Sequence, residues 1–156
     1  MAYIYPAPGV VGKEVTLTLT DATGTLSGNI VVPALQDVTV NAANDQFTWT
    51  QLNSGSKLTV ATTATNSLSM NIVLNQETFF GDNVATTVGK DGIFGLSTDK
   101  TYTHFELYLG ETSEGNVGKT MSGNAYVTGL APTVSADSPV WVSPITLSVD
   151  GDYLVA

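Results

Sequence analysis

The stretch "PVWVSPITLSVDG" (residues 139–151) alternates apolar and polar side chains near the C-terminal end of the chain. From Ile145 to Asp150 the odd positions are apolar and the even positions are polar, and Trp141 falls in the apolar series. Successive side chains of a strand point to opposite faces, so this period predicts one buried face and one face in water. Val140 and Val142 break the pattern, because they put apolar side chains on the face that should be wet.

The same two-residue period recurs along most of the chain, between clusters of Gly, Asn, Asp and Ser. It is seen in residues 14–20, 36–42, 45–51, 56–63, 67–74 and 104–109. Many short alternating segments separated by turn residues are typical of an antiparallel β-sandwich or barrel. The turn "NSGSK" (53–57) joins two of them and predicts a hairpin over residues 45–63. We therefore expect one mainly β domain over residues 1–156, with long loops.

Two parts of the chain lack this period. Residues 75–100 predict a long loop or helical insertion, with one short flanking helix near residues 81–89 that is N-capped by Asp82 or Asn83. Residues 1–12 predict an extended N-terminal arm, because two prolines interrupt an apolar run. Both segments carry apolar side chains, which must cover either the chain's own sheet or a neighbouring subunit.

The composition argues against catalysis and against tight nucleic-acid binding. Acidic residues outnumber lysines fourteen to five, there is no arginine, and the net charge is −9. A surface of this kind repels DNA. With no cysteine and only His104, which shares a strand face with Glu106, the sequence predicts no catalytic residues, no metal site and no cofactor. No apolar run reaches the length of a membrane span and the start does not read as a signal peptide, so we expect no membrane association.

The C-terminal third, residues 105–156, resembles the ending of major tail tube proteins of tailed bacteriophages. The resemblance is carried by "SGNAYVTGL" (122–130), the loop "APTVSADSP" (131–139) and the strand "VWVSPITLSVDG" (140–151). Earlier in the chain, "ALQDVTVNAANDQFTWT" (34–50) and "SLSMNIVL" (67–74) are similar to the segments that precede the helical region in that family. Family members have a clear amphipathic helix, which residues 81–95 do not provide.

The resemblance implies a structural virion protein that forms stacked hexameric rings, a tail tube through which DNA is ejected without tight binding. Related tubes occur in contractile injection machines. The implied partners are further copies of the chain and other tail proteins, namely the terminator, the tape measure protein and the baseplate or sheath. The implied location is the virion tail, with assembly in the cytoplasm of the bacterial host.

Two sets of residues are predicted to serve such a tube. Apolar side chains outside the regular strand pattern are predicted to contact neighbouring subunits: Tyr3, Ile4, Tyr5, Phe79, Phe80, Phe94, Val140 and Val142. Hydroxyl and acidic side chains are predicted to face the lumen, because they form no charge-assisted contact with phosphate: Asp37, Asp45, Thr48, Thr50, Thr59 and Glu106.

Two other binding roles fit parts of the pattern. A capsid decoration (cement) protein also combines a small β-domain with an extended arm. A carbohydrate-binding or adhesin β-sandwich would present Trp49 or Trp141 to a sugar, yet both share a face with aliphatic neighbours and are predicted to lie in the core or an interface.

Overall fold

The structure is a computed structural model, and it describes residues 14–32, 35–53, 55–84, 86–110, 118–137 and 140–156. The predicted N-terminal arm, including the contacts assigned to Tyr3, Ile4 and Tyr5, lies outside the described residues. None of the helices in the described part of the chain is long and apolar enough to cross a membrane.

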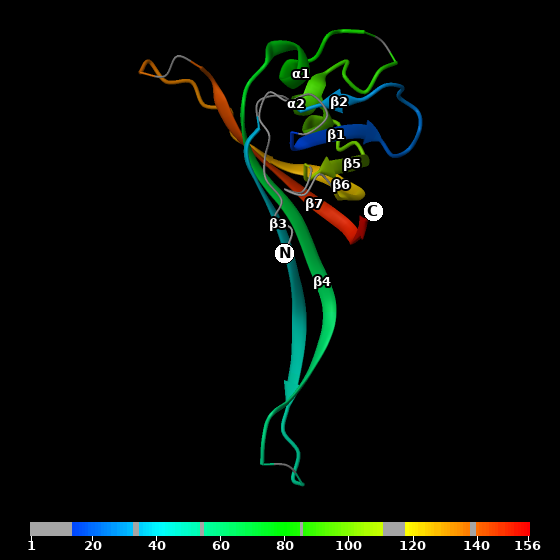
Figure 1. Cartoon of the computed structure of the whole chain (residues 1–156), viewed down its shortest axis with the longest axis vertical. Coiled ribbons are helices and arrows are strands. Elements are labelled where there is room, and N and C mark those ends of the chain that lie inside the picture. The colour runs from blue at the N-terminus through cyan, green and yellow to red at the C-terminus, as the bar shows by residue number, and fades with distance from the viewer. Residues whose placement is uncertain (1–13, 33–34, 54, 85, 111–117, 138–139) are drawn as a thin grey trace.

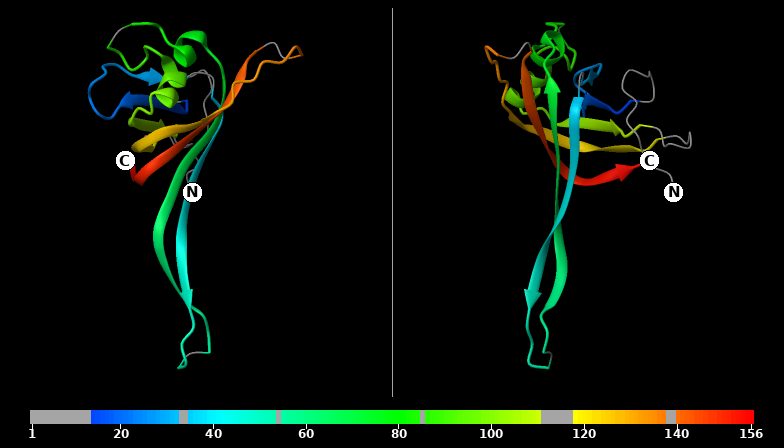
Figure 2. Two further views of the ribbon diagram at one scale, coloured as in Figure 1. Left: turned by 180° about the vertical axis from the view of Figure 1, so that it is seen from behind. Right: turned by 60° about the vertical axis from the view of Figure 1, so that its left-hand side comes forward.

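Seven antiparallel strands form one hydrogen-bonded sheet, which confirms the mainly β, antiparallel prediction. Their order across the sheet is β2-β1-β5-β6-β7-β4-β3. The strands are β1 (Thr16–Asp21), β2 (Ile30–Val31), β3 (Leu35–Trp49), β4 (Leu58–Val73), β5 (Thr103–Tyr108), β6 (Thr120–Leu130) and β7 (Val142–Val155). Figures 1 and 2 show that the sheet curves, with β3 and β4 extending far below the rest of the molecule.

The hydrophobic core lies on one face of this sheet. Alternate strand positions supply it, among them Leu17, Phe105, Leu147 and Leu68, all 0% exposed. Ile145 and Leu147 of β7 lie in this core and Val149 packs against it, as the alternation predicted. On the same side, the segment between β4 and β5 adds Phe79, Val88, Ile93 and Leu96 to the cluster. Most of the apolar content of residues 75–100 therefore covers the chain's own sheet.

The helix predicted at residues 81–89 is wrong. Two short helices flank that stretch instead, α1 (Gln76–Phe80) and α2 (Gly92–Thr98). Asn75 caps α1, since its Oδ1 accepts the backbone N–H groups of Glu77 and Thr78 at 3.0 and 3.3 Å. The residues predicted as caps, Asp82 and Asn83, lie beyond its end.

Two glycines explain why the helical turns lie where they do. Gly81 ends α1 with a φ of 104°, and Gly92 opens α2 with a φ of 67°. A Cβ added at Gly92 would lie 2.5 Å from the carbonyl oxygen of Phe79, and one added at Gly81 would clash with the backbone of Lys90. The two helices thus pack backbone to backbone, which only glycine permits here.

The β3–β4 hairpin, predicted over residues 45–63, is confirmed and is much longer than predicted. The two strands pair from Leu35 and Ile72 to Trp49 and Leu58, whereas β7 accompanies β4 only as far as Asn66. Below that point the described hairpin is a two-stranded ribbon projecting from the body (Figures 1 and 2).

Two side chains form hydrogen bonds at the point where the β3–β4 ribbon separates from β7, which we call the fork. Asn66 Nδ2 donates to the carbonyl of Gly151 at 2.7 Å, where β7 turns away with a φ of 89°. The hydroxyl of Tyr153 lies 2.7 Å from the carbonyl oxygen of Asn41 and 2.9 Å from that of Ser67, one on each strand of the ribbon. These contacts tie the C-terminal half of β7 to the base of the ribbon.

Candidate assembly surfaces

The face of the sheet opposite the core is polar on every described strand except the two-residue strand β2. Residues directly opposite one another on neighbouring strands repeat Thr, Ser, Asn and acidic side chains, as in the row Thr18, Glu106 and Ser122. We call this the polar face; it comprises Thr16, Thr18, Thr20, Asp37, Thr39, Asn41, Ser67, Ser69, Asn71, His104, Glu106, Ser122, Asn124, Tyr126, Thr128, Thr146, Ser148 and Asp150.

Cross-strand hydrogen bonds occupy many of these polar groups. Asn71 donates from its backbone N–H and its Nδ2 to the carboxylate of Asp37. Tyr102, just before β5, donates to Asp150 Oδ2 at 2.8 Å, and this bond is the main cause that raises the pKa of Tyr102. None of the described strands contains a lysine. The polar face is therefore rich in hydroxyl and amide groups, and its charged side chains are acidic apart from one histidine.

His104 sits on the polar face in a hydrogen-bonded setting. Its Nδ1 lies 3.0 Å from Asn124 Oδ1, and its Nε2 lies 3.6 Å from Glu106 Oε1. This confirms that His104 and Glu106 share a face, as the alternation of the strand predicted. In the described part of the chain no group of three or more His, Asp or Glu side chains is placed to hold a metal ion.

The predicted lumen residues do not share one face. Asp37 belongs to the polar face, and strand alternation puts Asp45 on the same side of β3. Thr48 is an odd number of positions from both, so it points to the other side, and Thr59 lies directly opposite it on β4. Thr50 follows the end of β3. Glu106 lies on the polar face, and all six residues are exposed.

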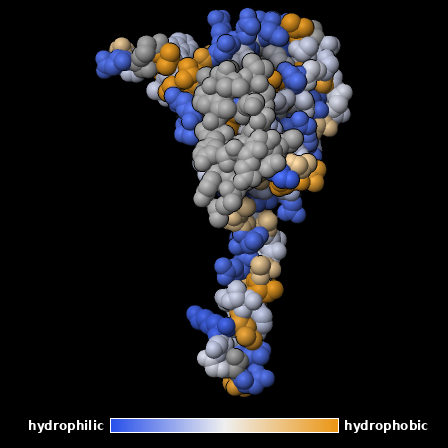
Figure 3. Space-filling view, in the orientation of Figure 1, coloured by the Kyte–Doolittle hydropathy of each residue, from blue (hydrophilic) through white to orange (hydrophobic). Residues whose placement is uncertain are grey.

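The far end of the hairpin carries an apolar patch, which we call the tip patch: Phe47, Trp49, Leu52, Leu58 and Val60. Phe47 is 59% exposed and stacks on Trp49, with ring centroids 5.8 Å apart. Leu52 is fully exposed in the turn. Figure 3 shows apolar residues at the surface of the protruding hairpin. Trp49 is therefore outside the core of its own chain.

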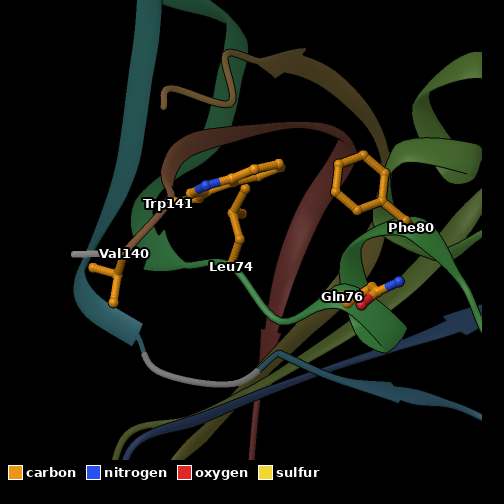
Figure 4. A pocket seen from close by; sticks show the side chains of 5 residues that line it. All are labelled: Leu74, Gln76, Phe80, Val140 and Trp141. Carbon is orange, nitrogen blue, oxygen red and sulfur yellow. The ribbon is translucent and has the colours of Figure 1, made fainter. Parts of the chain in front are cut away.

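A second apolar surface, the aromatic groove, lies beside α1 and has a volume of about 520 Å³. Its lining residues are Leu74, Gln76, Phe80, Val140 and Trp141. Figure 4 shows Leu74, just after β4, beside Trp141, just before β7, with Phe80 of α1 across from the indole ring and Val140 pointing away. Phe80 meets Trp141 edge to face, with ring centroids 6.5 Å apart. Phe94 of α2 adds a third ring, 6.1 Å from Phe80.

The structure corrects the set of residues that was predicted to contact neighbouring subunits. Phe79 is 0% exposed and belongs to the core, so its assignment as a subunit contact is wrong; it faces inward on α1 while Phe80 faces outward. Trp141 is 48% exposed, because it precedes β7 and does not reach the buried face that its odd position suggested. Val140 is exposed, whereas Val142 is half-buried and pairs with Thr133 through the backbone.

No protein-family model and no curated protein sequence matches this chain. Solved structures do match it. The SPP1 tail tube superposes with a TM-score of 0.66 at 13% identity, covering 94% of this chain and 78% of that one. The chain has the tail tube fold.

Two further solved structures match this chain over nearly their whole length. The tail of the empty gene transfer agent particle, computed with C6 symmetry, gives a TM-score of 0.63 at 12% identity and covers 90% of this chain and 95% of that one. A chain of the six-fold symmetrised anti-feeding prophage baseplate gives 0.65 at 11% identity, covering 96% and 97%. The resemblance to tail tube proteins seen in the sequence is thus confirmed at the level of the fold.

Proposed function

We propose that this protein is a structural tail tube subunit whose copies form hexameric rings, and that the rings stack into a tube through which DNA is ejected. The observation that carries the proposal is the match of 94% of the chain to the SPP1 tail tube. The six-fold symmetry of the gene transfer agent tail and of the anti-feeding prophage baseplate supports a ring of six. The role is structural and not catalytic.

The two edges of the sheet provide a way to close such a ring. Among the described residues, no strand pairs with the outer edge of β3, which is 15 residues long. At the other edge β2 covers β1 at only two positions, Val31 with Thr18 and Ile30 with Leu19. Unpaired edge strands are templates for pairing with another chain. Pairing of the β3 edge with the β1–β2 edge of the next copy would join six sheets into one barrel.

In this arrangement the polar face lines the lumen and the core with its helices lies outside. Hydroxyl and amide groups hydrate the wall, and Asp37, Glu106 and Asp150 repel phosphate, so DNA slides past without being held. Thr48 and Thr59 point to the opposite side of the ribbon and are left out of this lumen. The proposed partners are the other tail components, the terminator, the tape measure protein and a baseplate or sheath. The proposed place is the virion tail, assembled in the host cytoplasm.

The purified chain, concentrated and viewed by negative-stain electron microscopy, tests this function. We expect rings with six-fold symmetry, and tubes of stacked rings. Small oligomers that bind empty capsids would instead support a decoration protein. A monomer at every concentration tested, with no rings in the microscope, would overturn the proposal.

A further inference from the structure

A pair of tyrosines interrupts the polar face where β5, β6 and β7 lie side by side (Figure 1). The rings of Tyr102, just before β5, and Tyr126 of β6 are in contact, with centroids 5.2 Å apart and planes inclined at 41°. Tyr126 is 42% exposed, on a face that otherwise carries mainly hydroxyl, amide and acidic groups. Asp150 of β7 accepts the hydroxyl of Tyr102 at 2.8 Å. We call Tyr102, Tyr126 and Asp150 the tyrosine site.

We propose that the tyrosine site binds the guanidinium group of an arginine side chain carried by a polypeptide partner. A guanidinium is planar and cationic, so it stacks on an aromatic ring while its N–H groups donate to a carboxylate. The site offers both groups: Tyr126 stands opposite Ser148, so Asp150 is its diagonal neighbour on β7. Diagonal neighbours on adjacent strands are about 7–8 Å apart, a spacing that long side chains bridge. The bond from Tyr102 uses one oxygen of Asp150 and holds the carboxylate in place.

The charges around the site favour a cation. The charged side chains of the polar face are acidic apart from His104, whose Nε2 lies 3.6 Å from Oε1 of Glu106. None of the described strands contains a lysine, and none of the lysines that the structure describes forms an ion pair with Asp150. The same negative charge repels the phosphates of a nucleic acid. The surface therefore distinguishes a basic polypeptide, which it attracts, from DNA.

The polar groups beside the tyrosine site argue against a sugar or a metal ion as its ligand. A sugar ring also stacks on tyrosine, but the hydroxyls of Thr128 and Ser148 next to Tyr126 bond to each other at 2.9 Å. A neutral sugar also gains nothing from the net charge of Asp150. In the described part of the chain no group of three or more His, Asp or Glu side chains is placed to hold a metal ion. An arginine side chain uses both the ring and the charge.

The inference rests on the proposed function only for the place where the partner meets the site. With the polar face lining the lumen, each ring of six copies would carry six tyrosine sites, and the set would repeat from ring to ring. A polypeptide with several arginines could then contact several sites at once, which raises its overall affinity above that of one contact. Each contact is exposed to water and can break separately. Such a chain is retained in the lumen without being fixed there.

Binding of a fluorescently labelled peptide of alternating glycine and arginine, measured by anisotropy, tests the site. The control probe replaces each arginine by citrulline, its neutral isostere, and should bind much more weakly. Asp150→Asn and Tyr126→Leu are each expected to raise the Kd of the arginine peptide about fivefold. Tyr126→Phe keeps the ring, and Asp37→Asn removes one acid elsewhere on the polar face, so both should leave the Kd within about twofold. If Asp37→Asn weakens binding as much as Asp150→Asn, only the general acidity of the face attracts the peptide, and the proposal is overturned.

Chemical nitration locates the bound peptide on the unaltered protein, so this test does not depend on any variant folding. Tetranitromethane nitrates exposed tyrosine rings, and mass spectrometry identifies the modified residues. With the arginine peptide at about twice its Kd, nitration of Tyr126 should slow about threefold, because two thirds of the sites are occupied. Equal nitration with the arginine and citrulline peptides would overturn the proposal, as would protection of Tyr126 by neutral malto-oligosaccharides but not by the arginine peptide.

The footprint is read on the purified chain whether or not rings form, so the two proposals fail separately. Rings and tubes in which the arginine peptide leaves Tyr126 unprotected would refute the tyrosine site and leave the tube function intact. Protection of Tyr126 on a chain that forms no rings would support the site and refute the tube function.

Discussion

The turn between β1 and β2 depends on one carboxylate, and its loss is predicted to be visible as a pH-dependent change in stability. Asp21 is only 9% exposed. Its Oδ1 accepts the backbone N–H and the hydroxyl of Thr23 at 2.9 and 2.6 Å, and its Oδ2 accepts the hydroxyl of Thr25 and the backbone N–H of Leu26 at 2.8 and 2.9 Å. These bonds, the Thr23 hydroxyl first, lower the pKa of Asp21 from 3.8 to about 2.

A carboxylate whose pKa falls on folding stabilises the folded state whenever it is ionised. For Asp21 the contribution is complete above the unfolded pKa of 3.8, and it is lost as the pH falls through about 2. The shift corresponds to roughly 2 kcal/mol; because the turn lies at the edge of the fold near solvent, we expect about 1–2 kcal/mol. Asp21→Asn keeps the shape but gives up the charge and one acceptor, so it should lose this amount at neutral pH.

Urea unfolding of both proteins at pH 7 and at pH 2 measures the difference. We expect Asp21→Asn to be less stable by about 1–2 kcal/mol at pH 7, and the gap to close at pH 2 where the native carboxyl is becoming protonated. Asp152→Asn removes the same charge at an exposed position of β7 and should change the free energy of unfolding by less than about 0.5 kcal/mol. A gap that persists unchanged at pH 2, or none at pH 7, would refute the reasoning.

Three further outcomes are expected. Tyr153→Phe should lower the free energy of unfolding by about 1 kcal/mol and speed hydrogen exchange in the ribbon, since it removes the hydroxyl at the fork; unchanged exchange would show that the hydroxyl does not hold the ribbon. Asn75→Ala should cost about 1 kcal/mol in thermal or urea unfolding, because α1 loses its cap; a stability equal to that of the native chain would contradict the capping role. Tubes carrying both Asp37→Lys and Glu106→Lys should bind labelled DNA at physiological salt, with an affinity that falls steeply as salt is added, whereas native tubes and Asp99→Lys tubes should not; native tubes that bind DNA tightly would argue against the proposed lumen.

Alternation of side chains predicted the strands well because it depends on only one property, the burial of one face. In β7, Ile145 and Leu147 are in the core as expected. The rule failed at Trp141, since the strand begins one residue later and nothing in the local pattern marks that boundary. It also gave no sign that β7 would leave β4 at the fork, which depends on Gly151 and on contacts between residues far apart in the sequence.

The helical segment was predicted poorly for a related reason. Helix propensity in residues 81–89 is weak, and the decisive interaction is the close approach of two backbones at Gly81 and Gly92, which the sequence shows only as glycines in a loop. The burial of Phe79 and the exposure of Phe80 follow from the position of α1, so the two could not be separated beforehand. The aromatic groove combines residues 74–80 with 140–141, and only the fold brings them together.

The fork joins a wide body to a narrow ribbon through a single pair of strands. A pair of strands twists and bends more easily than a seven-stranded sheet, so the direction of the ribbon can change while both of its ends keep their shape. In a tube of the kind proposed above, small changes in the angle between body and ribbon would add up over many layers. A long assembly of these subunits would then curve smoothly under load, with no contact broken at any one level.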